Sequence, residues 1–309
     1  MTAESFWLIA GLLLVLTAAS LVSTALQRRA LGPNPTLENL DARIRAWWVM
    51  ASLAVAALLL GAGAVTLLFA LISFLALREF FTLSVSRPAD HWVLLGVFVL
   101  IIPIQYWLVW TEWYGLFTIF IPVWCFLFMP ALAVLRGDTT NFLHRIAETQ
   151  WAVMACVYAL SHVPALLTLP IPGFEGKQAL LVAFLLVVVQ GSDVLQYIAG
   201  KLWGRRKLAP SVSPSKTWEG FLGGVAAASL LGMALFWLTP FGPLGALGVA
   251  LFISLMGALG GLVASAIKRD RRVKDWGQMI EGHGGVLDRM DGVVFAAPVF
   301  FHLLRYFAM

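Results

Sequence analysis

Two stretches of the chain, residues 191–220 and 265–291, carry far more polar and charged side chains than the segments around them. Their basic residues include Lys216, Lys268, Arg269, Lys274 and Arg289. Arginine binds a phosphate group through two parallel hydrogen bonds, and lysine binds it as a compact positive charge. These residue types therefore predict a site that holds several phosphate groups.

Neutral polar residues and glycines accompany these cations. Hydroxyl donors flank Lys216, at Ser213, Ser215 and Thr217. In the second stretch, His283 is followed directly by Gly284 and Gly285. Glycines let backbone N–H groups approach an anion closely, as phosphate-binding turns require. We expect both groups of residues to contact a substrate.

Two acids, Asp288 and Asp291, stand three residues apart at the start of the last apolar run, so they share one helical face. Capping of the helix explains one of them. Two acids with an arginine between them favour a Mg²⁺ site, because Mg²⁺ takes oxygen ligands and bridges substrate phosphates. Asp193 lies near the end of another apolar run, where an uncompensated acid costs about 2.5–3.5 kcal/mol. The set predicts metal-assisted phosphoryl or nucleotidyl transfer at a membrane surface.

The elements that must position these residues are membrane spans. The chain has 309 residues, of which 61% are hydrophobic and only 12% are charged, whereas soluble domains carry about 25% charged residues. Runs of about 20 almost uncharged residues have the length that a helix needs to cross a bilayer. The sequence thus predicts an all-α, polytopic integral membrane protein with its active site in loops and helix ends of the C-terminal half.

About ten spans fit the apolar runs. They are residues 5–26, 46–60, 64–81, 92–110, 113–135, 151–169, 178–199, 221–239, 243–267 and 290–308. The second and third are short and nearly contiguous, so a re-entrant hairpin is an alternative for them. Residues 34–48 resemble a separate interfacial helix, with Asn34 as its cap and Pro35 at its first position. We divide the chain into N-terminal helices, residues 1–150, and a C-terminal catalytic region, residues 151–309.

The basic residues give this topology an orientation. Nineteen of the 21 Lys and Arg residues fall in five alternate loops, and only Lys177 and Arg305 lie on the other side. By the positive-inside rule those loops, and the candidate site with them, face the cytoplasm. The net charge of +5 then needs no nucleic-acid partner, because topogenic charge and attraction to anionic membrane lipids account for it.

The polar motifs resemble those of one enzyme family. The ordered elements are Ser265, Lys268-Arg269, Lys274-Asp275, His283-Gly284-Gly285 and Asp288-Arg289-x-Asp291, preceded by the stretch from Ser213 to Gly220. This pattern is similar to that of phosphatidate cytidylyltransferases, also called CDP-diacylglycerol synthases, over roughly residues 150–309. The resemblance implies that CTP and phosphatidate react to give CDP-diacylglycerol and pyrophosphate with Mg²⁺.

The resemblance also suggests roles for individual residues. Asp288 is the leading metal ligand, with Asp291, Asp193 and Asp275 as further ligands or supports. The expected phosphate-binding and catalytic cations are Lys216, Lys268, Arg269 and Arg289. The expected substrate contacts are Ser213, Ser215, Thr217, Lys274, His283, Gly284 and Gly285. Whether a second cation takes part stays open.

One departure stands out. Many bacterial members carry two acids just before the Lys-Arg pair, where this chain has Gly261 and Ala264. This loss favours one alternative, a lipid-transport homologue without catalysis. Two further alternatives are related CTP-dependent lipid enzymes, a polyprenol or phytol kinase and an ether-lipid cytidylyltransferase. A bacterial inner membrane is the simplest location, and the sequence leaves homodimer formation open.

Overall fold

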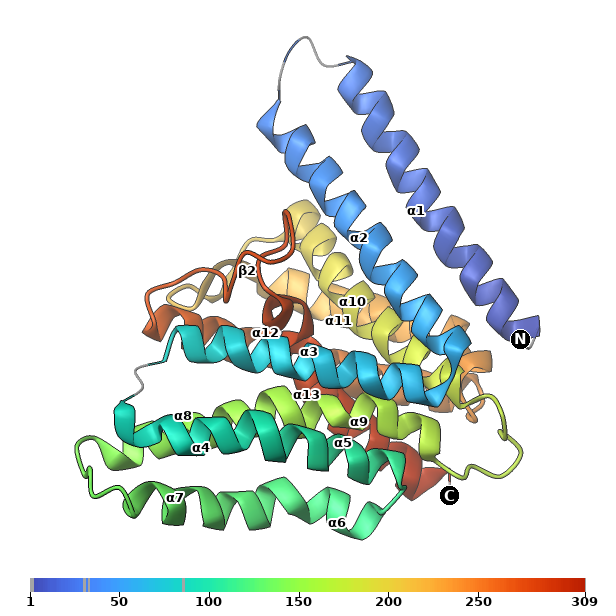
Figure 1. The fold of residues 1–309 in the computed structure, drawn as a ribbon. Helices are drawn as coiled ribbons and strands as arrows, with labels where there is room; N and C mark the ends of the chain where they lie inside the picture. Colours follow the sequence, from blue (N-terminus) through green and yellow to red (C-terminus); the bar gives the residue numbers. More distant parts are fainter. Residues whose placement is uncertain (1–2, 30–31, 33, 85–86, 309) are drawn as a thin grey trace.

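Helices make up nearly all of the structure, a computed structural model that describes residues 3–29, 32, 34–84 and 87–308 (Figure 1). The only sheet in these residues is an antiparallel hairpin of β1, Lys207–Ala209, and β2, Ser213–Thr217. Nine helical segments in the same residues are long and apolar enough to cross a membrane. The prediction of an all-α, polytopic membrane protein is confirmed.

The first half of the chain builds six long helical segments. Its helices are α1 (Ala3–Arg29), α2 (Pro35–Leu60), α3 (Ala62–Thr82), α4 (His91–Gly96), α5 (Ile102–Trp110), α6 (Tyr114–Ile119), α7 (Phe126–Val134), α8 (Phe142–Val153) and α9 (Leu160–Ala165). Short π-helical turns join α4 to α5, α6 to α7 and α8 to α9, at Val97–Ile101, Phe120–Cys125 and Met154–Ala159. Each joined pair therefore acts as one span.

The second half contains α10 (Gln178–Trp203), α11 (Trp218–Ala234), α12 (Pro243–Asp270) and α13 (Val286–Phe307). Each of the ten spans expected from the sequence overlaps one helical segment of the structure. The eighth corresponds to α11, which has 17 residues and is shorter than the nine candidate spans. The total of ten therefore stays a prediction.

The start of the chain differs from the expectation in one respect. Asn34 caps α2 by accepting a hydrogen bond from the Thr36 N–H, and Pro35 follows it, both as predicted. However, α2 continues without a break to Leu60, so the expected interfacial helix and the second span are one helix of 26 residues. Gly61 alone separates α2 from α3, with a φ of +96° that favours glycine. The second and third predicted spans are therefore two long helices, α2 and α3, and not the re-entrant hairpin that was the alternative.

Close packing through small residues holds the last four helices together. A Cβ atom at Gly224 of α11 would lie 2.3 Å from the Gln196 side chain of α10. One at Gly232 would lie 2.2 Å from the Ala250 Cβ of α12, and one at Gly260 would lie 2.6 Å from the Asp291 carbonyl oxygen of α13. Small residues at such positions let helix backbones approach closely within a membrane. This packing sets the distance between the helix ends that carry the predicted site.

The α1–α2 hairpin lies along the outside of the helical body (Figure 1). The Trp48 indole N–H donates a hydrogen bond to Ser20 Oγ and joins its two helices. Near the other end of α1, Lys177 and Glu4 form an ion pair of 2.7 Å.

The two regions predicted from the sequence are not separate in the helical body, because α3, α9 and α13 pack against one another. The boundary at residue 150 lies within α8, and the division stays a prediction.

Candidate functional site

The start of α13 is held by hydrogen bonds to two carboxylates, Glu79 and Asp288. Gly284 turns the chain with a φ of +85°, and Gly285 is the N-cap. The carboxylate of Glu79, a buried residue of α3, accepts hydrogen bonds from the Val286 and Leu287 N–H groups, at 2.9 Å each. A negative charge at a helix N-terminus satisfies free N–H groups and opposes the helix dipole. Glu79 thus links the N-terminal helices to the site.

Asp288 completes this helix start. Its Oδ2 accepts hydrogen bonds from the backbone N–H groups of Trp276, at 2.8 Å, and Gly285, at 2.9 Å. Its Oδ1 lies 2.6 Å from Lys268 Nζ, and both side chains of this ion pair are buried. All three donors approach a carboxylate that is only 5% exposed. Asp288 therefore fixes the position of Lys268 and of the loop between α12 and α13.

A second group of charges lies one helical turn further along α13. We call it the mixed-charge cluster and define it by four residues from two helices, α10 and α13, and the hairpin: Asp193, Lys216, Arg289 and Asp291. Lys216 and Arg289 act electrostatically on both Asp193 and Asp291, and the two acids act on each other. Gln190 of α10 holds the backbone beside it by donating a hydrogen bond to the Arg289 carbonyl oxygen.

Gly261 marks the centre of the mixed-charge cluster. A Cβ atom there would lie 3.2 Å from Lys216 Nζ and 3.9 Å from Asp291 Oδ2. The Lys216 ammonium thus reaches α12 at Gly261. Lys216 and Asp291 therefore both lie near Gly261, although they are 75 positions apart in the chain.

The hairpin that carries Lys216 is held mainly at its base. The Thr217 hydroxyl accepts a hydrogen bond from the Gly220 N–H and caps α11, and Thr217 is buried. Glu219 accepts hydrogen bonds from the Arg205 and Arg206 N–H groups. Ser215 is exposed and Ser213 is half-buried on β2. Three hydroxyl residues were predicted to contact the substrate. In the structure Thr217 caps α11, and Ser213 and Ser215 lie on β2.

Three more predicted residues lie in or next to the α12–α13 loop, which comprises residues 271–285. Arg269, at the end of α12, donates hydrogen bonds to the carbonyl oxygens of Val212 and Val273, so it ties the hairpin to this loop. Lys274 and Asp275 are exposed on the loop. A Cβ atom at Gly284 would lie 3.2 Å from the Asp275 Cβ and 2.7 Å from Asp288 Oδ2, so the loop is tightly folded there.

His283 packs inward, against α2. Its ring meets the Trp47 ring edge-on, with centroids 6.3 Å apart, and Arg43 Nε donates a hydrogen bond to the neighbouring Gly282 carbonyl oxygen. Burial lowers the pKa of His283 below its usual value, and the positive charges of Arg289 and Arg43 lower it further. The imidazole is therefore neutral at pH 7. In the described residues its Nδ1 has no hydrogen-bond partner.

The four predicted metal ligands do not converge on one point. Within residues 3–29, 32, 34–84 and 87–308, no group of three or more His, Cys, Asp or Glu side chains is arranged to hold a metal ion. The Asp288 carboxylate accepts hydrogen bonds from three donors, and Asp275 is exposed. Asp193 and Asp291 remain, and the charge of Asp193 acts on Asp291. Such a pair fits a Mg²⁺ ion that takes its other ligands from water and substrate phosphates.

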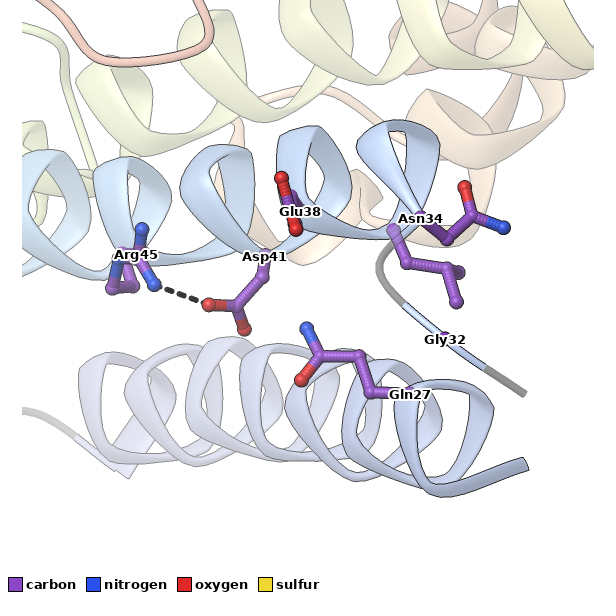
Figure 2. A pocket seen from close by; sticks show the side chains of 7 residues that line it. Gln27, Gly32, Asn34, Glu38, Asp41 and Arg45 are labelled. Atoms are coloured by element: carbon purple, nitrogen blue, oxygen red, sulfur yellow. Dashed lines mark hydrogen bonds and ion pairs between the residues drawn. The ribbon is translucent and has the colours of Figure 1, made fainter. Parts of the chain in front are cut away.

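A separate polar cavity of about 370 Å³ lies between the end of α1 and the start of α2. Figure 2 shows Gln27 of α1 facing the polar side chains of α2, with Asp41 and Arg45 joined by an ion pair. Glu38 and Asp41 give its lining an acidic character. None of the site residues predicted from the sequence lines this cavity.

Two residues of the site escaped sequence reasoning. Glu79 gave a signal, because it is the one acid in the apolar run of residues 64–81, where Arg78 is its only charged neighbour. Trp276 gave none: it is one of 13 tryptophans, and only the structure shows its ring stacked on Phe80, with centroids 5.2 Å apart. Glu79 binds the start of α13 from α3, and Trp276 packs the α12–α13 loop against Phe80 of the same helix.

Fold and site together define a polytopic membrane protein with a mixed-charge site formed by α10, α12, α13 and the hairpin. Residues 41–307 match the model of the cytidylyltransferase family, so the chain belongs to this family of nucleotidyltransferases. The uncharacterized protein YnbB of Escherichia coli K12 is 43% identical over 266 residues, which are 85% of this chain and 87% of YnbB.

Two relatives carry a more specific name. The phosphatidate cytidylyltransferase of Bacillus subtilis 168 is 44% identical over 125 residues, which are 40% of this chain and 46% of that enzyme. The phosphatidate cytidylyltransferase of Staphylococcus aureus COL is 42% identical over 127 residues, 40% of this chain and 48% of that enzyme. These alignments span about half the length of the named enzymes. The resemblance seen in the motifs is confirmed at the level of the family.

Proposed function

We propose that this protein transfers the cytidylyl group of CTP to phosphatidate and releases pyrophosphate. The observation that carries the proposal is the mixed-charge cluster, in which Lys216 and Arg289 act electrostatically on two acids, Asp193 within α10 and Asp291 near the start of α13. Family membership and the partial similarity to phosphatidate cytidylyltransferases support the same reaction. Its product, CDP-diacylglycerol, belongs to phospholipid synthesis.

The chemistry needs charge neutralisation more than an activated side chain. A phosphate oxygen of phosphatidate attacks the α-phosphorus of CTP and forms a new P–O bond. The bond from that phosphorus to the oxygen bridging the β-phosphorus breaks, and pyrophosphate leaves with the electron pair. Both substrates are polyanions, so positioning and positive charge supply most of the rate. Lys216 and Arg289 lie where they would hold the phosphates of the two substrates.

We assign the contact with Mg²⁺ to Asp291 and Asp193, because their carboxylates are not engaged by a helix start. When bound, Mg²⁺ neutralises charge that develops on the nucleotide phosphates. Asp288 then serves as a positioning residue: it keeps the Lys268 ammonium at the edge of the cluster. Lys274, Ser213 and Ser215 remain accessible to a nucleotide that arrives from water.

The same proposal includes the location of the site. The basic loops would face the cytoplasm of a bacterial cell, whose inner membrane would supply phosphatidate and whose water would supply CTP and Mg²⁺. We propose no nucleic-acid partner. Formation of a homodimer stays a prediction.

The direct test uses purified protein in detergent micelles with phosphatidate, Mg²⁺ and CTP labelled on the α-phosphate. We expect label in the lipid fraction, and we expect EDTA to abolish it. Asp291→Asn should remove transfer, whereas Asp270→Asn, on the exposed end of α12, should retain it.

Three outcomes would contradict the proposal. Lipid that takes label only from γ-labelled CTP would identify a lipid kinase. Label that enters only an ether-linked acceptor would identify an ether-lipid enzyme. No label with any of these lipids, from protein that unfolds cooperatively, would point to a homologue without catalysis.

A further inference from the structure

The last part of α10 exposes a face that is divided lengthwise into polar and apolar residues. Asp193, Tyr197 and Lys201 are exposed and stand four residues apart, so they lie one above the other on the helix, and we call them the polar stripe. Beside it runs an apolar stripe of exposed residues, each one position further along the chain: Val194, Ile198 and Leu202. A membrane helix that faced acyl chains alone would not carry a polar stripe.

The polar stripe leads away from the site. Asp193, at one end, belongs to the mixed-charge cluster, and the charges of Lys216 and Arg289 act on it. Lys201, at the other end, lies eight residues further, which is about 12 Å along a helix. Its ammonium group lies over the Tyr197 ring, 5.8 Å from the centroid. A ligand group that binds at Lys201 is therefore a short distance from the site and is connected to it by exposed polar side chains.

Positive charge gathers where the polar stripe ends. Lys201 is followed by Arg205, Arg206 and Lys207, all exposed, and no ion pair among the described residues includes any of these four side chains. Glu219 is the only acid in residues 194–220, and it accepts hydrogen bonds from the backbone N–H groups of the two arginines rather than from their side chains. The four cations are thus available to an anion from outside the protein.

Two tryptophans indicate where in the membrane these cations lie. Trp203 stands between Lys201 and Arg205 and is exposed. Trp218 is exposed as well, and its backbone N–H donates a hydrogen bond to the Arg206 carbonyl oxygen, so it lies beside the same segment. Tryptophan is enriched at the level of the lipid head groups. The cations therefore lie at head-group level, with the apolar stripe of α10 on the side of the acyl chains.

This order of residue types selects one kind of ligand. A water-soluble polyphosphate matches the cations but has nothing to place against the apolar stripe. A lipid without net charge matches the apolar stripe but leaves the cations unpaired. A lipid with a terminal phosphate matches both, because its charge lies at the water-facing end of its acyl chains.

From these observations we propose that this face of α10 is the docking surface for a lipid with a terminal phosphate. The phosphate binds first at Lys201 and then passes along the polar stripe to the mixed-charge cluster. The choice of this head group rests on the proposed function, whereas docking itself requires no reaction.

The test is a photocrosslinking experiment on the full-length protein in phosphatidylcholine vesicles, without CTP. Tyr197→p-benzoylphenylalanine places a photoreactive group on the polar stripe. Trp92→p-benzoylphenylalanine is the matched control, because Trp92 is an exposed aromatic residue of α4 that also has a cation, Arg136, over its ring. The vesicles contain a small, equal amount of either radiolabelled phosphatidate or radiolabelled phosphatidylcholine.

We expect the ratio of crosslinked phosphatidate to crosslinked phosphatidylcholine to be at least about fivefold higher at Tyr197 than at Trp92. About fivefold is the factor that one basic residue supplies toward an anionic lipid. Adding Lys201→Gln to the Tyr197 variant should lower its ratio by about the same factor. Adding Arg28→Gln instead, at the exposed end of α1, should leave the ratio unchanged.

A second measurement covers a photoreactive variant that does not fold. Phosphatidate is titrated into detergent-solubilised Lys201→Gln/Arg205→Gln and into the control Arg28→Gln/Arg29→Gln, whose changes lie near the acidic side chains of the α1–α2 cavity. Binding should weaken at least fivefold in the first variant and stay unchanged in the control. Equal ratios at the two photoreactive positions, or equal binding by the two double variants, would overturn the proposal. So would a double variant at Lys201 and Arg205 that loses binding of CTP but not of the lipid.

Failure of the proposed function gives a different result. In that case the label-transfer assay shows no lipid product, while the crosslinking ratio is still measured on the same protein. A high ratio at Tyr197 together with absent transfer would support the docking surface and contradict only the reaction. Transfer without a lipid preference at Tyr197 would do the reverse.

Discussion

The α12–α13 loop and the β1–β2 hairpin are both short, basic segments at the same end of the helices, but the rest of the chain holds them differently. The loop is fixed by Glu79 from α3, by Arg43 from α2 and by the Asp288 carboxylate. The hairpin is held at its base by Thr217 and Glu219, and by one hydrogen bond from Arg269.

This difference separates two roles that basic residues share in the sequence. Around the α12–α13 loop, charged side chains stabilise the fold: at the end of α12, the Lys268 ammonium forms a buried ion pair with Asp288. In the hairpin, Lys216 extends from a strand into the mixed-charge cluster without a carboxylate partner within ion-pair distance among the described residues. Substitutions in the loop should therefore affect folding and activity together, and those in the hairpin should affect activity alone.

The largest effect is expected from Asp288→Asn. It leaves the buried Lys268 charge without compensation, which typically costs about 3–5 kcal/mol in free energy of unfolding. We expect a large drop in thermal stability in detergent and label transfer below detection. Asp270→Asn, whose side chain is 74% exposed, should change the free energy of unfolding by less than about 0.5 kcal/mol. Normal stability of Asp288→Asn would show that the loop does not depend on this pair.

Glu79→Ala comes next. It removes the acceptor of two N–H groups at the start of α13, for a loss of about 2 kcal/mol in free energy of unfolding. Because α13 carries Asp291, we also expect turnover to fall by roughly a hundredfold. Glu79→Gln keeps one side-chain oxygen and should recover part of both losses. If the alanine variant retained full turnover, α3 would have no part in positioning the site.

Lys216→Ala tests the hairpin. Its free energy of unfolding should stay within about 0.5 kcal/mol of the wild-type value. Turnover should fall by roughly a hundredfold, because one charge that stabilises the transition state is lost. Lys216→Arg keeps the charge and should restore some activity. Parallel loss of stability and turnover would make the hairpin resemble the loop and would remove the contrast between them.

The smallest effect concerns pH. The folded-state pKa of His283 lies below the usual 6.5, so the unfolded chain binds its proton first as the pH falls. Stability should therefore decrease below pH 6.5, and the decrease should end below the folded-state pKa. His283→Gln should flatten the dependence of the melting temperature on pH in this range. His144→Gln, at an exposed histidine of α8, is the matched control for the loss of an imidazole.

The sequence predicted well those features that depend on local pattern. Apolar runs indicated the spans, and the Asn34-Pro35 pair indicated the start of α2. The polar motifs identified the residues that the structure gathers at the ends of α10, α12 and α13. The spacing of Asp288 and Asp291 could not distinguish their roles, because the difference lies in partners from other parts of the chain.

Long-range partners explain the remaining differences. Asp288 is engaged by Lys268 and by the backbone of Trp276, and neither contact follows from residue spacing. Thr217 caps α11, although its place in a polar motif suggested substrate binding. The helix α2 is continuous because no residue after Pro35 ends it before Gly61. The sequence did not predict this continuity, because the apolar run after Trp48 is short and was interpreted as a separate span.

The contact between Glu79 and α13 also has a consequence for synthesis. Glu79 and its partner Val286 are 207 positions apart in the chain. At a ribosomal rate of about 5–20 residues per second, Glu79 leaves the ribosome about 10–40 s before its partner. During that interval the acid must be tolerated in an unfinished protein by water, lipid head groups or a chaperone. The structure around Glu79 is therefore complete only after α13 has been made, and a chain that stalls before α13 leaves this carboxylate without the two N–H groups that it binds in the structure.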